Sequence, residues 1–232
     1  MPNMNSTRNI STLSEKVKSK ELKKAASDFR YFLNQGYPRK ATLDLVGNRY
    51  GLTFNERHLL HRGIFSDTDS NSREKRKISI DKIRNIDLAI DGYNVIITIE
   101  AGLSGQPLIL GDDGFIRDIS GLSGNFKKTK KTDEALQLII DILKKWKPHQ
   151  TLFLLDAPIS MSGKLAQEIR GWLKQEGLPG DAMAVKVPEK TLIGFPGVVA
   201  TSDTAIIDQS KKVIDLAGYI VSKKIRSKSI IR

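Results

Sequence analysis

At 232 residues the chain is long enough for one or two domains with a buried core, and its 38 Lys and Arg against 26 Asp and Glu give a formal net charge of +12 at pH 7. It has no cysteine, which excludes disulfides, thiolate zinc sites, iron–sulfur clusters and cysteine nucleophiles, and which fits a reducing compartment. No apolar run reaches the roughly 18 residues of a membrane span, and the polar N-terminus lacks the apolar core of an export signal, so we expect a cytoplasmic protein.

The N-terminal part of the chain is expected to be a small, basic, all-helical domain. Residues 1–20 are polar with few apolar anchors and are predicted to be disordered or frayed. Over residues 21–65, apolar side chains recur at helical spacing and predict three helices. The signals that delimit these helices are Gly36-Tyr37-Pro38, Gly51, and a capping pair formed by Thr53 and Glu56.

Most of the positive charge belongs to this end of the chain. Residues 1–84 hold 18 basic and 9 acidic residues, whereas residues 85–232 hold 20 and 17. Lys and Arg that contact phosphates release counterions, so such a segment suits a polyanion, and we expect a nucleic acid, RNA rather than DNA. A solvated charged surface is the alternative interpretation of the same excess.

The segment Ser66–Lys77 is polar and has no periodicity, so residues 66–84 are predicted to link this domain to a second one over residues 85–232. In the second domain apolar runs alternate with segments of helical spacing, which predicts an α/β fold with a mostly parallel sheet covered by helices. The expected strands are Ile86–Ile90, Thr151–Leu155 and Val198–Ala200. The expected helices are Asp133–Lys145 and Gly163–Lys174. Val95–Ile99 fits either a strand or a helix.

Three aspartates directly follow the apolar runs that are predicted to be strands. They are Asp91, Asp156 and Asp203. Ligands of open parallel sheets lie beyond the carboxyl ends of the strands, so these carboxylates are expected to converge. Clustered carboxylates repel one another, and Mg²⁺ or Mn²⁺ is the expected compensating cation. Such a cation suits phosphodiester hydrolysis, although any one aspartate at a strand end is more often a turn former or a helix cap.

Further side chains are candidates for the same site. Asp208 is expected to face it from the helix that follows Asp203. Lys164 lies at an expected helix N-terminus, where free backbone amides bind anions, although the serines beside it are equally well explained as helix caps. Glu134 opens a helix, which favours a carboxylate for structural reasons, and Asp113 lies in a GDDG segment that makes a good turn.

Two short motifs carry a resemblance to a known superfamily. The segment IDGYNVI resembles the opening strand of the PIN/NYN nucleases, and VVATSD resembles their later strand that ends in Thr-x-Asp or Ser-x-Asp. Over most of its length the chain also resembles a largely archaeal family with a domain of unknown function, through these motifs and through GDDGFIRDISG and LLDAPISMSG.

The resemblance to the PIN/NYN nucleases implies roles for individual residues. It makes Asp91, Asp156 and Asp203 the metal-binding acids, Asn94 the polar residue beside the first of them, and Asp208 an auxiliary acid. The acid that the superfamily takes from a middle helix has no clear counterpart, because Glu134 and Asp113 compete for that role.

The segment ATLDLVGNRYGLTFNERHLLHRGIF is loosely similar to a helix-turn-helix, which implies that Arg49, Arg57 and Arg62, together with His58, contact phosphates. Helix pairs of this size are also common as plain packing units.

The sequence thus predicts a PIN-like, divalent-metal-dependent nuclease with a helical, nucleic-acid-binding module. The alternative is a catalytically weak nucleic-acid-binding regulator. Acidic ligands do not distinguish RNA from DNA, or internal cleavage from cleavage at an end.

Overall fold

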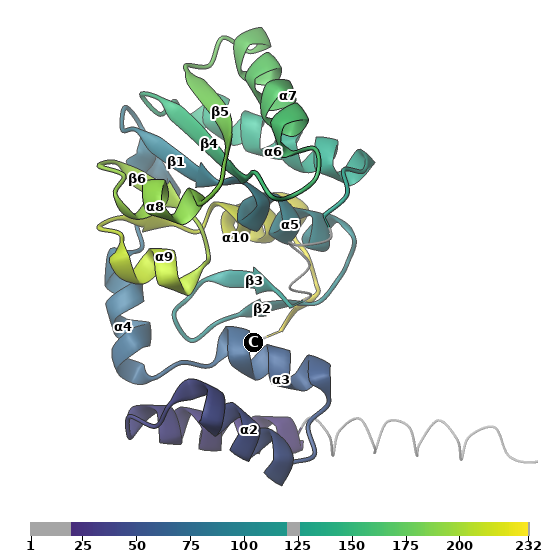
Figure 1. The fold of residues 1–232 in the computed structure, drawn as a ribbon, viewed down its shortest axis with the longest axis vertical. Helices are drawn as coiled ribbons and strands as arrows, with labels where there is room; N and C mark the ends of the chain where they lie inside the picture. Colours follow the sequence, from purple (N-terminus) through teal and green to yellow (C-terminus); the bar gives the residue numbers. More distant parts are fainter. Residues whose placement is uncertain (1–19, 120–125, 232) are drawn as a thin grey trace, which may run out of the picture.

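The computed structural model describes residues 20–119 and 126–231, arranged as a helical N-terminal part and a larger α/β part (Figure 1). The N-terminal helices lie at one end of the long axis, the main sheet lies at the other, and a small second sheet lies between them. The segment 1–20, which the sequence predicts to be disordered, lies outside the described residues apart from its last residue. Among the described residues no helix is both long enough and apolar enough to cross a membrane.

The N-terminal part contains the three predicted helices. The chain is helical over residues 20–34, and α2 and α3 follow at Arg39–Arg49 and Phe54–Gly63. The predicted cap of α3 is present, because the Thr53 hydroxyl accepts from the Glu56 backbone while the Glu56 carboxylate accepts from the Thr53 backbone. These helices share a small hydrophobic core of their own, whose buried members are Ala25, Phe29, Val46, Leu52 and Leu60.

The segment that the sequence predicts to be a linker contains a fourth helix, α4 (Asp67–Arg76), and a short 3₁₀ turn at Ile80–Ile83. This helix has no apolar residue and is held by polar interactions instead. The Ser66 hydroxyl caps its first turn. Basic side chains occupy its last turn, where their positive charge interacts favourably with the negative end of the helix dipole. Its Arg73 side chain is only 7% exposed and pairs with acids of the α/β part. A division into domains near residues 66–84 stays a prediction.

The α/β part is built on a five-stranded sheet with the order β5-β4-β1-β6-β7, and every neighbouring pair is parallel. The strands are β1 (Leu88–Asp91), β4 (Thr151–Asp156), β5 (Gly180–Val185), β6 (Val198–Ala200) and β7 (Val213–Ile214). The helices are α5 (Gly92–Leu103), α6 (Lys130–Trp146), α7 (Ser162–Gln175), α8 (Pro188–Ile193), α9 (Thr204–Gln209) and α10 (Leu216–Ile220), which continues into a π-helical turn at Val221–Ile225. The predicted α/β class with a mostly parallel sheet is confirmed.

Side chains along the central strand β1 alternate between two hydrophobic cores. Leu88 and Ile90 pack in the larger core with residues of α5, α6, α7 and α10, whereas Ala89 packs in the smaller core with residues of α8 and α9. Helices therefore cover both faces of the sheet, as expected for parallel strands. The ambiguous segment Val95–Ile99 is part of α5, where its apolar side chains pack against the first of these faces.

A small second sheet, which the sequence does not reveal, has the order β3-β2-β8. Its strands are β2 (Leu108–Leu110), β3 (Ile116–Asp118) and β8 (Ile230–Ile231). β2 and β3 are antiparallel and β8 runs parallel to β2, so residues from near the end of the chain complete a sheet begun in its middle. This sheet lies between the main sheet and α3, where it joins the two parts of the molecule (Figure 1).

Candidate active site

The three predicted aspartates meet at one edge of the main sheet. Asp91 ends the central strand β1, Asp156 ends its neighbour β4, and Asp203 lies shortly after its other neighbour, β6. Because all three strands are parallel, their carboxyl ends lie at the same edge. The structure brings the three side chains to one cavity of about 200 Å³ at the point where the strand order reverses around β1.

A glycine allows α5 to begin immediately beyond β1. A Cβ on Gly92 would lie 2.9 Å from the backbone oxygen of Leu154 and 2.4 Å from the Leu155 side chain, so a larger residue would push α5 away from β4. This close approach places Asn94 beside the loop after β6. The Asn94 side-chain oxygen accepts hydrogen bonds from the backbone and the hydroxyl of Ser202, at 2.9 and 3.0 Å. Asn94 thus positions the loop that carries Asp203.

Further hydrogen bonds fix this loop. The Thr201 hydroxyl donates to Asp91 at 2.8 Å and accepts from the Asp203 backbone at 3.0 Å. From the second sheet, the Arg117 guanidinium donates to the Ser202 carbonyl at 2.7 Å. The loop is therefore held from β1, α5 and β3 at once.

Two acids that the sequence analysis did not select also line the cavity. Asp118 ends β3 and is 5% exposed, and Glu189 lies in the first turn of α8. Arg62 of α3 reaches the same cavity and pairs with Asp118 at 3.2 Å. The sequence signal for Asp118 is weaker than that for Asp91 or Asp156, because only Phe115 and Ile116 are apolar ahead of it and Arg117 stands directly before it. Five carboxylates thus face one guanidinium.

This excess of negative charge perturbs the central acids. The pKa of Asp91 is raised to about 7, mainly by burial and in addition by the carboxylates of Asp203, Asp156 and Glu189, while the hydrogen bond from Thr201 opposes the rise. The pKa of Asp156 is raised as well, first by burial and then by Glu189. Strongly perturbed acids in a cavity are typical of functional sites.

The side chains as they stand do not form a ready-made metal cage. Among residues 20–119 and 126–231, no three His, Cys, Asp or Glu side chains lie close enough to hold one metal ion. One reason is that an Asp203 oxygen accepts from the backbones of Ala205 and Ile206 and so caps α9. The donors themselves are hard carboxylate oxygens, which are the ligands that Mg²⁺ and Mn²⁺ prefer.

Three other predicted acids lie outside this cavity. Asp208, expected to face the site from the first turn of a helix, lies in the last turn of α9 and pairs with Arg73 through two bonds of 2.7 and 2.8 Å. Asp113 is fully buried and pairs with Arg117. Glu134 is exposed on α6. Neither Asp113 nor Glu134 supplies the fourth acid at the cavity, where Asp118 and Glu189 lie instead.

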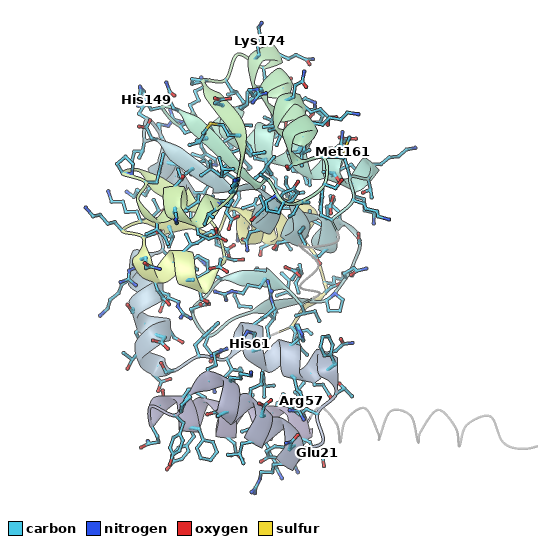
Figure 2. All side chains as sticks on the ribbon, viewed as in Figure 1. Glu21, Arg57, His61, His149, Met161 and Lys174 are labelled. Atoms are coloured by element: carbon cyan, nitrogen blue, oxygen red, sulfur yellow. The ribbon has the colours of Figure 1, made fainter. Side chains whose placement is uncertain are left out.

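The basic residues predicted to contact nucleic acid are not gathered on one surface. Arg57, labelled in Figure 2, donates to the Leu52 carbonyl and to the Asn48 side chain, so it ties α3 to the end of α2. Arg49 is exposed and lies over the Tyr50 ring, whereas Arg62 faces the acidic cavity. Lys164 lines a second, larger cavity beside the first.

Comparison with known proteins places the chain in a family. Residues 80–219, more than half of the chain, match the family described as "Domain of unknown function (DUF5616)". The chain belongs to this family. Residues 21–76, ahead of this DUF5616 domain, match a second family, described as "Protein of unknown function (DUF434)".

A relative of similar length matches most of the chain. The chain is 34% identical over 202 residues to the uncharacterized protein MJ0935 of Methanocaldococcus jannaschii, and the alignment covers 86% of this chain and 96% of that protein. No solved structure matches the chain. The predicted likeness to a largely archaeal family with a domain of unknown function is confirmed, whereas the likeness to the PIN/NYN nucleases stays a prediction.

Proposed function

We propose that this protein is a divalent-metal-dependent nuclease that hydrolyses phosphodiester bonds of RNA at the acidic cavity. The observation that carries the proposal is the buried Asp91, which shares one cavity with Asp156, Asp203 and two further acids at the switch point of a parallel sheet. Such a cluster destabilises the folded chain, because desolvated carboxylates repel one another. A cation would compensate this charge, and function would then explain why the acids gather there.

Magnesium does not need a complete cage of protein ligands. It keeps several waters and is commonly bound by one or two carboxylates together with substrate phosphates. Asp91 and Asp156, at the ends of adjacent strands, would hold it, and a rotation of Asp203 away from its capping position would add a third acid. When bound, the cation would neutralise a phosphate oxygen and lower the pKa of a coordinated water.

The remaining residues of the site would shape it and balance its charge. Asn94 and Thr201 hold the loop of Asp203 in place through hydrogen bonds that already exist. Arg62 is the cation nearest to the place where a phosphate would lie, and its pairing with Asp118 holds it at the wall of the cavity. A guanidinium in this place can bind phosphate oxygens directly.

The proposal is tested with labelled single-stranded and structured RNA, in magnesium or manganese and in chelator. Asp203→Asn and Asp156→Asn remove negative charge with little change of shape, and asparagine also caps helices, so folding should survive. We expect the turnover of both variants to fall at least about a hundredfold, and chelator to abolish the turnover of the parent. Asp141→Asn, on the exposed side of α6, is the matched control and should retain the parent rate.

The alternative is a regulator that binds nucleic acid without cleaving it. It is favoured by one observation, the absence of a ready-made metal cage among the described residues. A titration with magnesium separates the two functions, because RNA cleavage by a nuclease should rise with magnesium, whereas a regulator should bind RNA and cleave it at no magnesium concentration. Cleavage that persists in chelator or in Asp203→Asn would assign the activity to another site or to a contaminant.

A further inference from the structure

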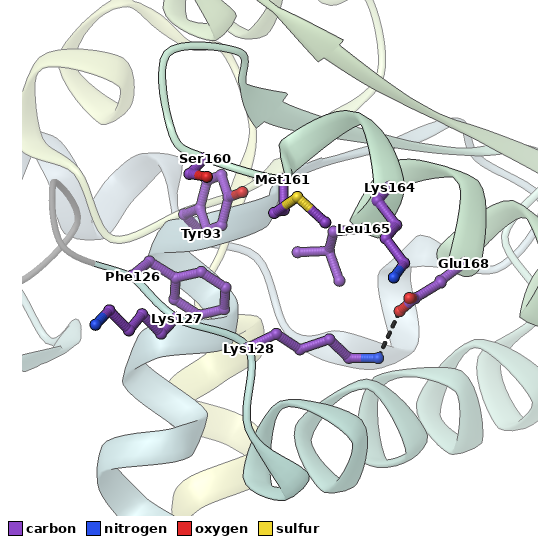
Figure 3. A pocket seen from close by; sticks show the side chains of 9 residues that line it. All are labelled: Tyr93, Phe126, Lys127, Lys128, Ser160, Met161, Lys164, Leu165 and Glu168. Carbon is purple, nitrogen blue, oxygen red and sulfur yellow. Dashed lines mark hydrogen bonds and ion pairs between the residues drawn. The ribbon is translucent and has the colours of Figure 1, made fainter.

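A second cavity, of about 850 Å³, opens beside the acidic one (Figure 3). We call it the lysine cleft. Its walls are Tyr93 of α5, the segment 126–128 before α6, and the start of α7 with the turn before it. Tyr93 lines both cavities and so connects them. The lysine cleft falls within the range of roughly 300–1,000 Å³ typical of ligand sites, whereas the acidic cavity, at about 200 Å³, lies below that range.

The lysine cleft differs from the acidic cavity in charge. Lys127, Lys128 and Lys164 line it, and Glu168 is its only lining acid among the described residues. Lys128 pairs with Glu168 at 2.5 Å, as Figure 3 shows, and with Asp133 at 2.9 Å. In the described part of the chain, Lys127 and Lys164 form no ion pair and are exposed. Two ammonium groups thus remain available to an anionic ligand.

The same cleft has an apolar wall. The Phe126 ring is only partly buried and packs edge to face on Tyr93, with ring centroids 4.8 Å apart. At the rim lies Met161, which is 63% exposed and has left-handed backbone angles, with φ at 66°. A methionine in this conformation is costly, and such strain is commonly found at functional sites. Figure 3 shows Met161 and Phe126 on either side of the cleft.

We propose that the lysine cleft binds a single-stranded nucleic-acid segment next to the phosphate that enters the acidic cavity. One unpaired base lies between Phe126 and Met161, and the phosphates flanking it lie at Lys127 and Lys164. This inference rests on the proposed function, because it takes the acidic cavity as the place of cleavage. An aromatic surface combined with basic side chains is the usual means of binding single strands, since every base has a face that stacks.

The charge of the acidic cavity makes such a subsite necessary. Its five carboxylates repel a phosphodiester backbone until a cation is bound, and its volume of about 200 Å³ is too small for more than a short part of a strand. Affinity for the rest of the substrate must therefore come from neighbouring surfaces. The lysine cleft adjoins the acidic cavity through Tyr93, and a duplex would not present the unpaired base that its apolar wall suits.

The test is the binding of fluorescently labelled oligoadenylates of about 12 nucleotides, as RNA, as DNA and as a duplex, to the full chain in chelator. We expect Lys127→Ala/Lys164→Ala to weaken the binding of single strands at least tenfold and to lower the slope of log affinity against log salt by about 1.4, which is two phosphate contacts. Phe126→Ala should weaken binding at least about fivefold at unchanged salt slope, because it removes stacking and no charge.

A matched control removes the same charge elsewhere. Lys174→Ala/Lys211→Ala replaces two exposed lysines, one at the far end of α7, as Figure 2 shows for Lys174, and one before β7 at the opposite edge of the sheet. Preferential binding of single strands, RNA or DNA, that is lost in the cleft variant and kept in the control supports the inference. Equal loss in both variants, a preference for the duplex, or no binding by the parent overturns it.

This binding test and the cleavage test fail independently. Cleavage that is absent under every condition, while single strands bind through the lysine cleft, would refute the nuclease and leave the cleft as a binding site of the regulator. Metal-dependent cleavage at a rate that the cleft variant does not change, at substrate concentrations below saturation, would keep the nuclease and refute the cleft.

Discussion

Asp91 is a buried carboxylate, and its burial disfavours the ionised form. It ends the central strand, is buried, and accepts one hydrogen bond, from Thr201. A buried carboxylate with so few partners is expensive to ionise, and the neighbouring acids increase the cost. Its pKa of about 7, against an ordinary value of 3.8, therefore makes the folded state bind a proton more tightly than the unfolded state does.

This difference predicts a pH dependence of stability. In chelator, the free energy of unfolding of the parent should fall as the pH rises from about 4 to about 7, by at most ~4 kcal/mol for this one group, and then level off. Asp91→Asn keeps an acceptor for Thr201 and cannot ionise, so it should lack this fall and be the more stable protein at pH 8. Urea unfolding of both proteins at pH 5 and pH 8 measures the difference.

Other raised acids, Asp156 and Asp215, act in both proteins, so the difference between parent and variant isolates Asp91. Asp141→Asn, far from the cavity, should follow the parent at both pH values. If the stability of Asp91→Asn depended on pH as strongly as that of the parent, Asp91 would not be the buried, protonatable group described above.

Sequence reasoning found some residues of the site and missed others for a physical reason. Asp91, Asp156 and Asp203 each follow a buried strand of the same parallel sheet, and that pattern is local to each strand. Glu189 belongs to a short helix whose position depends on how α8 packs against β1 and β4. Asp208 lies outside the cavity because five positions along a helix exceed one turn and rotate it by about 140° from Asp203, to the side where it pairs with Arg73 of α4.

At the scale of elements, α4 has the least apolar surface and depends on a buried ionic cluster. Its Arg73 binds Asp208 through two hydrogen bonds and lies 3.5 Å from Asp113, and Arg117 binds Asp113 at 2.7 and 2.8 Å. The Arg73 and Arg117 guanidinium groups both lie over the Phe65 ring. A polar sequence without periodicity cannot reveal this arrangement, because its partners lie far along the chain.

The cluster predicts a ranking of substitutions. Arg117→Met leaves the fully buried Asp113 with the longer contact to Arg73 and a backbone hydrogen bond from Phe115, so it should lower the free energy of unfolding most, by about 3–5 kcal/mol. Arg73→Met leaves Asp113 its bidentate partner and should cost about 1–3 kcal/mol. Asp208→Asn should cost less than about 1 kcal/mol, because the Asp208 side chain is 42% exposed. Urea unfolding at neutral pH gives all three values.

A different order would contradict this account of α4. In particular, a loss for Asp208→Asn as large as that for Arg117→Met would mean that the Arg73 pair, rather than the buried Asp113, carries the stabilisation.

The strongly apolar elements, unlike α4, were predictable from sequence because their pattern is local. The runs that form β1, β4 and β6 and the amphipathic pattern of α6 and α7 reflect local burial, whereas β2, β3 and β8 have at most three residues each and are defined only by pairing.

Over the whole molecule, the basic excess of the N-terminal part is used in two ways. Several of its arginines hold the fold together, because Arg30 binds Asp112, Arg39 binds carbonyl groups at the end of α3, and Arg62 and Arg73 pair with acids of the α/β part. The exposed lysines of this part remain for a polyanion, among them Lys23, Lys24 and Lys40. Counting charge in the sequence therefore overestimates what is available for binding.

The available lysines lie far from the lysine cleft. The helix over residues 20–34 and α2 occupy one end of the long axis, and α7 occupies the other (Figure 1). A strand of about four nucleotides in the cleft is too short to reach both ends, whereas a much longer one gains a second, linked contact. We therefore expect Lys23→Ala/Lys24→Ala/Lys40→Ala to weaken the binding of a long single-stranded RNA and to lower its salt slope by up to about 2, and to leave the binding of a strand of about four nucleotides unchanged.

Two arms separate this expectation from a general effect of net charge. Lys174→Ala/Lys211→Ala/Lys212→Ala removes the same charge from exposed positions of the α/β part and should leave the salt slope for the long RNA near that of the parent. If this control lowers the slope as much as the N-terminal variant does, the binding is diffuse and the helical part has no special role. If the N-terminal variant weakens the short strand as well, the short strand binds at the helices, and the separation of the two surfaces along the long axis is refuted.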